Sequence, residues 1–352
     1  MEDKQFVGFD DQAEREREEA VRAAQTEKDA LLPPDPEAIL EVRHLKKHFV
    51  LKKTLMGKPL STLKAVDDIS IKIKPGETIG IVGESGCGKT TMGRTILKLH
   101  QPTAGQIFFE GKDIAGYTPK QRRALRMDMQ IVFQDPYSSL PPRSTVGDIL
   151  AEPVRVHNIV PPDQVKEYVL KIMEQCGLRD YYYERYPHEF SGGQRQRIGI
   201  ARSIILNPDL IIADEPISAL DVSIQAQVIN LLNGLREQLG LTILFIAHDL
   251  SVVKYFSDRI GVMYYGKIVE LAPSDELFDH PLHPYTKSLL SAIPLPDPEY
   301  ERGRKRITYN PLAEHDYSVQ QPTMREVKPG HFILCNDAEF AKYMEEVNKV
   351  KA

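Results

Sequence analysis

The 352-residue sequence has no tryptophan and only three cysteines, Cys87, Cys176 and Cys335, which lie far apart. Cysteines spaced in this way form neither a disulfide framework nor a CxxC pair, so we expect a reducing compartment. The sequence also lacks any run of about 18 apolar residues, which excludes a membrane-spanning helix. Its acidic start, MEDKQFVGFDD, has no apolar core and is not a secretory signal. These absences together predict a soluble cytoplasmic protein.

No excess of basic residues is present either. The chain has 45 Lys and Arg against 50 Asp and Glu, a formal net charge of −5. Residues 1–30 contain ten acidic and five basic side chains and so carry the whole imbalance. The balanced remainder argues against a dedicated nucleic-acid binder. Apolar residues make up 41% and charged residues 27%, which is typical of a globular protein that buries a core.

Composition shifts divide the chain into three parts. Residues 1–38 form a charged N-terminal extension, rich in helix formers up to a proline cluster at 33–36, which we interpret as a solvated leader. A helix that docks on a partner is the alternative. Residues 39–279 alternate apolar strands with helical stretches, including a helical insertion at about 144–205. Residues 280–352 are proline-rich and predict an irregular tail with one helix, over 337–350, peripheral to the catalytic elements.

Short apolar runs within the middle part predict buried strands. They cover residues 78–82, 130–133, 210–213 and 242–247, whereas 39–43 and 69–73 alternate like half-exposed strands. Strands that alternate with helices form a parallel sheet, so the fold class expected is α/β.

A phosphate-binding loop follows the first buried strand. Residues 83–90, GESGCGKT, match the pattern G-x-x-x-x-G-K-[ST] between a strand and a helix. The glycines let backbone N–H groups turn toward an anion, and the helix N-terminus adds positive potential. Lys89 is expected to reach the β- and γ-phosphates, and Thr90 to ligate Mg²⁺. Cys87 is read as contributing its backbone N–H rather than a catalytic thiol.

Polar side chains end three of the other buried strands. Asp214 ends an apolar strand and can hold Mg²⁺ through water, and Glu215 can polarise the attacking water. His248 ends the strand over 242–247, where it could contact a γ-phosphate. Gln134 follows the strand over 130–133 and can ligate Mg²⁺ or water through its amide oxygen.

A second anion-binding helix terminus is predicted at Ser191-Gly192-Gly193-Gln194, ahead of a helix to Leu206. In the fold it is too far from Lys89 to serve the same nucleotide, so a second subunit would have to supply the phosphate.

Taken together, these segments resemble the ATP-binding subunits of ABC transporters. In chain order they are the Walker A loop at 83–90, the Q-loop at Gln134, the signature at Ser191–Gln194, the Walker B strand at 210–214 with the catalytic Glu215, the D-loop ending at Asp221, and the switch His248. The resemblance covers about 39–300 and implies a RecA-like parallel-sheet core, an antiparallel β subdomain, a helical signature subdomain and a C-terminal appendage.

The resemblance also implies which residues hold the nucleotide. An aromatic side chain that stacks on adenine aligns best with Phe49. The remaining ATP contacts expected are Gly83, Ser85, Gly86, Cys87, Gly88, Lys89, Thr90, Thr91, Ser191, Gly192, Gly193, Gln194 and Asp221. Mg²⁺ would be held by Thr90, Gln134 and Asp214. No catalytic position is substituted, so the ATP site is expected to be competent.

Finer features are similar to the oligopeptide and dipeptide permease ATPases, and in particular to their F-type subunit. They lie at 132–140, 187–194, 218–227 and 283–294, and the F-type feature is at 325–331. The implied function is ATP-driven import of peptides, by closure and reopening of an ATPase dimer at the cytoplasmic face of the inner (plasma) membrane. The implied partners are a second, unequal ATPase, two transmembrane permease subunits and an extracytoplasmic solute-binding protein.

Two alternatives remain open at this point. Nickel and glutathione importers are relatives of the same family and would use the same machinery. A soluble ABC ATPase acting on DNA or ribosomes is the alternative of another class. It is disfavoured because only 101 residues separate Lys89 from Ser191, with no heptad run, and because the chain has a single cassette.

Overall fold

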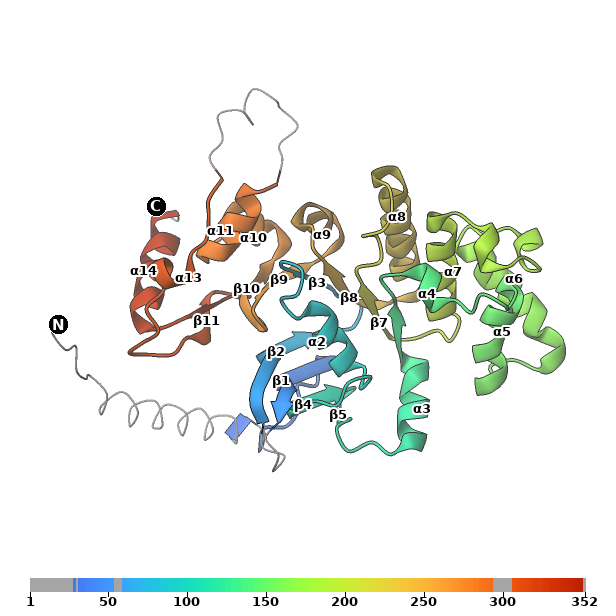
Figure 1. Ribbon diagram of the computed structural model, residues 1–352, viewed down its shortest axis with the longest axis horizontal. Helices are drawn as coiled ribbons and strands as arrows, with labels where there is room; N and C mark the ends of the chain where they lie inside the picture. Colours follow the sequence, from blue (N-terminus) through green and yellow to red (C-terminus); the bar gives the residue numbers. More distant parts are fainter. Residues whose placement is uncertain (1–27, 30, 54–58, 294–305, 351–352) are drawn as a thin grey trace, which may run out of the picture.

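The computed structural model describes residues 28–29, 31–53, 59–293 and 306–350. Most of the charged N-terminal extension, interpreted as a solvated leader with a docking helix as the alternative, therefore lies outside the described residues. Two sheets occupy the middle of the molecule, with a helical lobe at one end and the C-terminal elements at the other (Figure 1).

The larger sheet has eight strands in the order β11-β12-β10-β9-β3-β8-β7-β6. Strands β9, β3, β8, β7 and β6 run parallel, and β10, β12 and β11 continue the sheet antiparallel. Every residue of β3, β7 and β8 is buried, because both faces of these apolar strands are covered. The bounds are β3 (Thr78–Val82), β6 (Met129–Val132), β7 (Leu210–Asp214), β8 (Thr242–Ala247), β9 (Arg259–Tyr264), β10 (Lys267–Pro273), β11 (Thr323–Lys328) and β12 (His331–Cys335).

The second sheet is antiparallel, in the order β2-β1-β4-β5. Its strands are β1 (Leu40–Lys53), β2 (Pro59–Ile73), β4 (Ala104–Phe109) and β5 (Lys112–Asp113). Helix α2 (Lys89–Ile96) contacts strands of both sheets, and its buried Met92 and Ile96 belong to a core that the two sheets share. This arrangement fixes the start of α2, and with it the phosphate loop, between the sheets.

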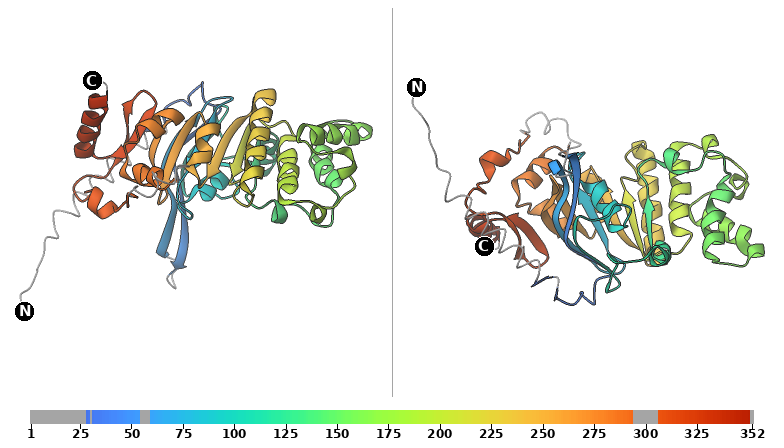
Figure 2. Two further views of the ribbon diagram at one scale, coloured as in Figure 1. Left: turned by 90° about the horizontal axis from the view of Figure 1, so that it is seen from above. Right: turned by 60° about the horizontal axis from the view of Figure 1, so that its bottom comes forward.

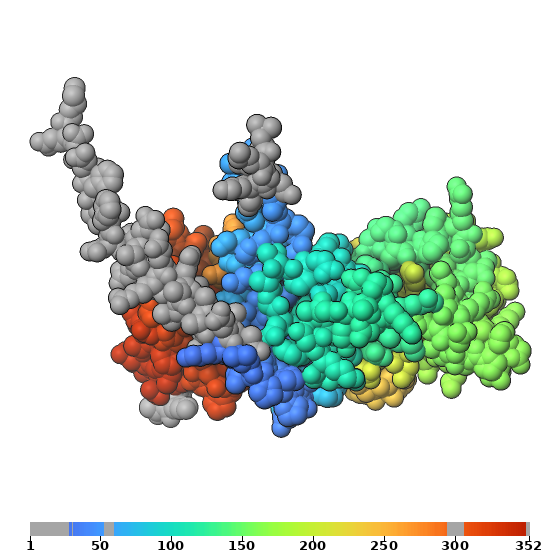
Figure 3. All heavy atoms as spheres, turned by 90° about the horizontal axis from the view of Figure 1, so that it is seen from below, coloured from blue at the N-terminus to red at the C-terminus, as the bar shows by residue number. Residues whose placement is uncertain are grey.

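The helical insertion expected at 144–205 is present as a lobe. It holds α5 (Val146–His157), α6 (Val165–Gln175) and α7 (Gly192–Ile204), with short 3₁₀ segments at Pro162–Gln164, Asp180–Tyr182 and Pro187–Glu189. Thr145 begins α5, because its hydroxyl accepts a hydrogen bond from Asp148 N at 3.1 Å. Seen from below, the strands of the antiparallel sheet (blue) lie between this lobe (green) and the C-terminal elements (red) (Figure 3).

The remaining helices of the core are α3 (Pro119–Asp128), α4 (Pro136–Ser139), α8 (Val222–Leu239), α9 (Leu250–Phe256) and α10 (Ser274–Asp279). Of these, α8 connects β7 to its neighbour β8 and α9 connects β8 to β9 of the larger sheet, α3 leads from β5 of the antiparallel sheet to β6, α4 follows β6, and α10 follows β10. No helix of the described residues is long and apolar enough to cross a bilayer.

The tail is more ordered than the expectation of an irregular segment with one helix. The expected helix is present as α14 (Asp337–Val350), but α11 (Pro284–Ser291), α13 (Pro311–Glu314) and the hairpin β11–β12 precede it. β12 pairs with β10, so the tail extends the central sheet. The expectation was wrong because proline content was weighted above the alternation in 323–335, which turns at Gly330 with φ 77°.

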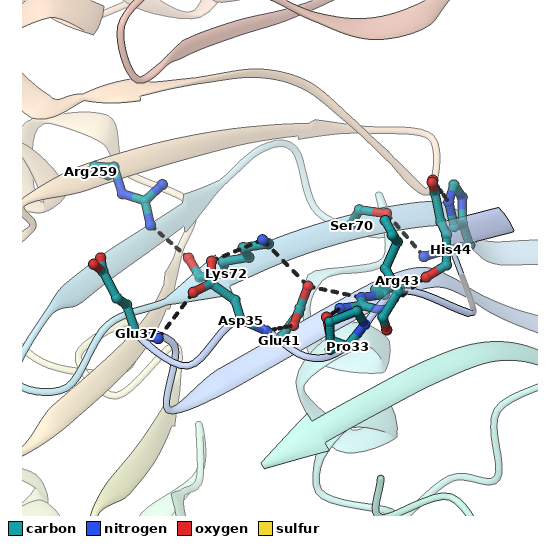
Figure 4. A network of polar contacts seen from close by, with 11 residues as sticks. Pro33, Asp35, Glu37, Glu41, Arg43, His44, Ser70, Lys72 and Arg259 are labelled. Carbon is teal, nitrogen blue, oxygen red and sulfur yellow. Dashed lines mark hydrogen bonds and ion pairs between the residues drawn. The ribbon is translucent and has the colours of Figure 1, made fainter. Parts of the chain in front are cut away.

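The described part of the N-terminal segment is bound to the antiparallel sheet (Figure 4). The buried Arg43 guanidinium donates to the backbone carbonyls of Asp29, Leu32 and Pro33, each at 2.8 Å, and to Glu41 Oε1 at 2.8 Å. The N-terminal segment forms no strand at these residues, so the three hydrogen bonds from Arg43 satisfy its backbone carbonyls. They hold the segment against β1.

Candidate active site

The loop between β3 and α2 has the geometry of an anion nest. Gly83, Gly86 and Gly88 have φ values of 156°, 82° and 114°. A Cβ on Gly88 would lie 2.0 Å from Ala65 O, so no other residue fits there. Gly88 is the N-cap of α2 and gives no side-chain cap, which leaves N–H groups at the helix start for an anion.

Lys89 lies across this loop. Its side chain is buried, and Nζ donates to Gly83 O at 2.7 Å and Glu84 O at 3.0 Å. The same ammonium is 3.7 Å from Glu215 Oε1. Lys89 thus lies against the loop with the Glu215 carboxylate as a neighbour, and its contact with phosphates stays a prediction. Cys87 is buried as well, and this burial raises the pKa of its thiol, which does not suit a nucleophile.

Asp214 ends β7 directly behind the loop. Thr90 Oγ1 donates to Asp214 Oδ1 at 2.7 Å. Asp214 is 1% exposed, and its Oδ2 has no hydrogen-bond partner among the described residues, although Arg94 Nη2 lies 3.6 Å away. Burial raises the pKa of this carboxyl, and the hydrogen bond from Thr90 opposes the rise. A buried carboxylate oxygen without a donor beside a threonine hydroxyl fits a hard cation such as Mg²⁺.

Glu215 lies at the centre of three other predicted residues. Gln134 Nε2 donates to Glu215 Oε2 at 2.9 Å, and His248 Nδ1 is 3.7 Å from the same oxygen. Lys89 approaches the other carboxylate oxygen. Glu215 also has a left-handed backbone, φ 46°, which is uncommon for a residue with a side chain and is typical of functional sites.

A cleft of about 330 Å³ opens in front of these groups. Its walls include Phe49 from β1, the loop from Ser85 to Thr91, Gln134 and Glu215. Phe49, which is predicted to stack on adenine, therefore lines the same cleft as the phosphate loop. A smaller cavity of about 30 Å³ is lined by Glu215, Ser218 and His248 and is large enough for one water molecule.

Sequence reasoning missed two tyrosines at this site. Tyr265 lines the cleft and is 76% exposed, in the turn between β9 and β10. Tyr285, from α11 of the tail, is buried, and its hydroxyl accepts a hydrogen bond from Glu84 N at 3.2 Å. The expectation of a purely peripheral tail is therefore wrong at this point. Tyr265 lies in none of the motifs, and the feature at 283–294 that contains Tyr285 gave no sign of a contact with the loop, because only the folded chain brings the two together.

The second predicted anion-binding helix terminus, at Ser191 to Gln194, is well formed but lies apart from the cleft beside Lys89. Ser191 begins α7 through a capping box, in which its hydroxyl accepts from Gln194 N at 3.4 Å and Gln194 Oε1 accepts from Ser191 N at 3.0 Å. Neither these residues nor Asp221, which is the exposed N-cap of α8, line the cleft beside Lys89. A Cβ on Gly193 would lie 2.5 Å from Ile224 Cγ2, so a larger residue there would force the Ile224 side chain to shift.

Two family models match the sequence. The model described as "ABC transporter" matches residues 66–218, and the model described as "Oligopeptide/dipeptide transporter, C-terminal region" matches residues 269–318. The first spans the sequence from β2 to just beyond Glu215, and the second begins in β10 and covers α11 and Tyr285.

Curated relatives match almost along their whole length. The oligopeptide transport ATP-binding protein OppF of Bacillus subtilis (strain 168) is 56% identical over 311 residues, which is 87% of this chain and 99% of the relative. The dipeptide transport ATP-binding protein DppF of Lactococcus lactis subsp. cremoris (strain MG1363) is 50% identical, over 88% of this chain and 97% of the relative.

Solved structures of ATP-binding cassettes have the same fold. A dimer of the cassette MJ0796 in a post-hydrolysis state bound to ADP and Pi matches with a TM-score of 0.60 and 26% identity, over 67% of this chain and 98% of that one. The cbiO1 subunit from Clostridium perfringens matches with a TM-score of 0.60 and 28% identity, over 69% and 92%. These findings confirm the resemblance, and the chain belongs to the oligopeptide and dipeptide transport ATP-binding proteins of the ABC transporter family.

Proposed function

We propose that this chain is the ATP-hydrolysing subunit that powers import of peptides through an ABC transporter. The observation that carries the proposal is the position of Glu215, whose carboxylate contacts Gln134, His248 and Lys89 at the end of a buried strand. The names of the curated relatives, oligopeptide and dipeptide transport ATP-binding proteins, support a peptide rather than nickel or glutathione as the cargo.

Hydrolysis would use the residues gathered at the cleft. Backbone N–H groups of the loop and the Lys89 ammonium bind the phosphates, and Phe49 stacks on the base. Glu215 accepts a proton from a water molecule as it attacks, because its carboxylate borders the one-water cavity that His248 also lines. His248 and Gln134 position Glu215 and the water. The Lys89 ammonium then neutralises part of the negative charge that develops on the phosphates during hydrolysis.

Thr90, Asp214 and Gln134 would hold Mg²⁺, with Thr90 as a direct ligand and Asp214 acting through water. A Mg²⁺ ion held there would supply positive charge to offset the negative charge that develops on the phosphates during hydrolysis.

The signature residues Ser191 to Gln194 would serve the nucleotide of a second subunit. We infer this because the signature residues do not line the cleft beside Lys89, so a nucleotide bound there would be out of their reach. ATP would then lie between Lys89 of one ATPase and the signature of the other, and its binding would close the dimer. We infer an unequal partner ATPase, because the relatives are F-type subunits.

The remaining partners follow from the same proposal. Closure and reopening would drive two permease subunits between inward and outward states, with the chain at the cytoplasmic face of the membrane. An extracytoplasmic solute-binding protein would deliver the peptide. A soluble role on DNA or ribosomes is disfavoured, because the two curated relatives described above carry transport names and match almost end to end.

Reconstitution tests the proposal. The chain is co-expressed with its permeases, partner ATPase and binding protein, and the complex is placed in proteoliposomes. We expect peptide-stimulated ATP hydrolysis and peptide uptake, both lost with Glu215→Gln and kept with the surface variant Glu237→Gln. Stimulation by nickel or glutathione but not by peptides would overturn the proposed cargo. Hydrolysis without any transport would overturn the role.

A further inference from the structure

A two-residue turn joins β9 to β10 at the wall of the nucleotide cleft. Tyr264 pairs with Lys267 across this turn. Between them, Tyr265 and Gly266 have φ values of 41° and 81°. Positive φ at both positions is the geometry of a type I′ turn, which favours asparagine, aspartate or glycine at the first position. A tyrosine there is strained, because its Cβ crowds the backbone in the left-handed region.

The turn is held between the phosphate loop and β2. Gly266 N donates to Cys87 O at 2.8 Å, and Gly266 O accepts from Asp67 N at 2.8 Å. A Cβ on Gly266 would lie 2.8 Å from Lys64 O, so a glycine allows this close approach. In both views of Figure 2 the orange strands of the larger sheet lie beside the blue strands of the antiparallel sheet. Contacts on two sides therefore fix the position of Tyr265.

The Tyr265 side chain is largely uncovered, although its backbone is held. Its ring is 76% exposed and touches the Tyr264 ring edge-on, with 4.7 Å between centroids. It lines the cleft of about 330 Å³, where Glu215 has a similarly strained backbone, φ 46°. Strain of this kind is concentrated at functional sites. Since neither the exposed ring nor the strained turn stabilises the folded chain, the tyrosine points to a ligand in the cleft.

Tyr265 lies at the same part of the cleft wall as Phe49. Phe49 pairs with Leu63 of β2, and the next two residues of β2, Lys64 and Ala65, also line the cleft. The turn with Tyr265 packs on this same stretch of β2, through Gly266 and Lys64 O. Because Phe49 is predicted to stack on adenine, this part of the cleft would hold the nucleoside.

We propose that Tyr265 is a second aromatic contact for the nucleoside of ATP, made through its ring. Aromatic rings pack well on the faces and edges of nucleobases, and a ring on a rigid turn gives up little freedom on binding. The inference rests on the proposed function, since it takes ATP as the ligand of the cleft. It adds a residue that belongs to none of the motifs.

The variant Tyr265→Asn tests the proposal, because asparagine removes the ring and suits the turn. We expect ATP binding to weaken about fivefold or more. The melting temperature should rise by about 1–3 °C, because the strain is relieved. Titration calorimetry of the purified full-length chain with Mg-ATP, beside a thermal melt, measures both. Unchanged ATP affinity would overturn the proposal. A fall in both quantities would also overturn it, since the ring would then support the turn.

Two further variants separate the ring from other causes. Tyr265→Phe keeps the ring and should bind ATP like the wild type. If it loses as much affinity as Tyr265→Asn, the hydroxyl makes the contact and the proposal fails. Tyr255→Asn is the matched control, because Tyr255 is 81% exposed on α9 and does not line the cleft. It should also bind ATP like the wild type, and an equal loss there would show that the effect is not specific to Tyr265.

Inorganic tripolyphosphate shows which part of ATP the ring contacts. It offers phosphates to the loop but has no nucleoside, so Tyr265→Asn should bind it like the wild type. An equal loss for tripolyphosphate and ATP would mean that the change acts on the loop through the Gly266–Cys87 hydrogen bond, and would overturn the proposal. A wild-type chain that binds no ATP would overturn the proposed function as well, whereas a failure confined to Tyr265→Asn leaves that function standing.

Discussion

The hydroxyl of Tyr285 accepts a hydrogen bond from the backbone N–H of Glu84 at 3.2 Å, although 201 positions separate the two residues. Glu84 is the second residue of the phosphate loop, and Tyr285 belongs to a helix of the tail. The Tyr285 ring is buried and packs on Tyr264 at 4.4 Å and Tyr309 at 5.4 Å between centroids. The tail thus has a direct contact with the loop that is expected to bind phosphate.

Tyr285→Phe should weaken ATP binding about two- to tenfold with little change in melting temperature. The variant keeps the ring and its packing but removes the acceptor that holds Glu84 N in place. A hydrogen bond of this kind contributes ~0.5–1.5 kcal/mol. Equilibrium titration with a fluorescent ATP analogue, beside a thermal melt, measures both quantities.

Tyr309→Phe is the control for this change, because it removes a hydroxyl from the same ring cluster without touching the Tyr285–Glu84 hydrogen bond. It should bind ATP like the wild type. If both variants weaken ATP binding equally, the effect comes from packing of the cluster and not from the contact with the loop.

The sequence predicted the core of the site because each of its motifs is local. Gly83 to Thr90, Asp214 and His248 all follow buried strands, and the ends of parallel strands meet at one edge of a sheet. The contact of Tyr285 with Glu84 depends on how distant segments pack, which periodicity does not encode. The tail hairpin is different, since its alternating residues and Gly330 were visible but were outweighed by the surrounding prolines.

Glu215→Gln should keep ATP binding and lower the hydrolysis rate about 10²–10⁴-fold, as expected for loss of a general base. An amide of nearly the same shape can still contact Gln134, so the site should stay assembled. Turnover of the assembled transporter and ATP affinity of the purified chain are measured together. Wild-type turnover in the variant would show that another group activates the water.

Asp214→Asn should remove most of the dependence of ATP binding on Mg²⁺. The wild-type carboxylate has a buried oxygen without a hydrogen-bond donor, which a cation and its water would satisfy. Loss of such a partner typically lowers metal affinity about 10- to 100-fold. ATP titrations across a Mg²⁺ series, with a chelator as the metal-free reference, test this. An unchanged Mg²⁺ midpoint would remove Asp214 from the metal site.

His283 should make the folded protein less stable in mild acid. It is buried beside His315 and Lys287, and burial lowers its pKa to about 3, against about 6.5 in an unfolded chain. Because the unfolded state binds the proton more readily, stability is full above the unfolded pKa and is lost as the pH falls toward the folded one. Between pH 7 and 5 the loss is on the order of 2 kcal/mol.

The variant His283→Asn isolates this contribution. Asparagine can still accept the hydrogen bond from Tyr285 N, now 3.1 Å from His283 Nδ1, but it does not titrate. Urea unfolding at the two pH values should show a smaller pH effect for the variant, even if its stability at neutral pH is lower. Equal pH effects in both proteins would assign the acid sensitivity to other groups.

Gly192→Asp should separate the two ATP sites of the assembled dimer. A Cβ at Gly192 meets only Leu220 Cδ2 at 3.5 Å, so the chain should fold and bind ATP normally at its own Lys89. The added carboxylate would face the γ-phosphate held by the partner ATPase, a contact between like charges.

Photolabelling each subunit with an azido-ATP analogue under trapping conditions resolves the sites, with Gly192→Ala as the uncharged control. We expect hydrolysis at the partner's site to fail while this chain stays labelled, because the signature at the start of α7 lies outside its own cleft. Loss of labelling on this chain, with the partner unaffected, would mean that the signature acts on the nucleotide of its own subunit.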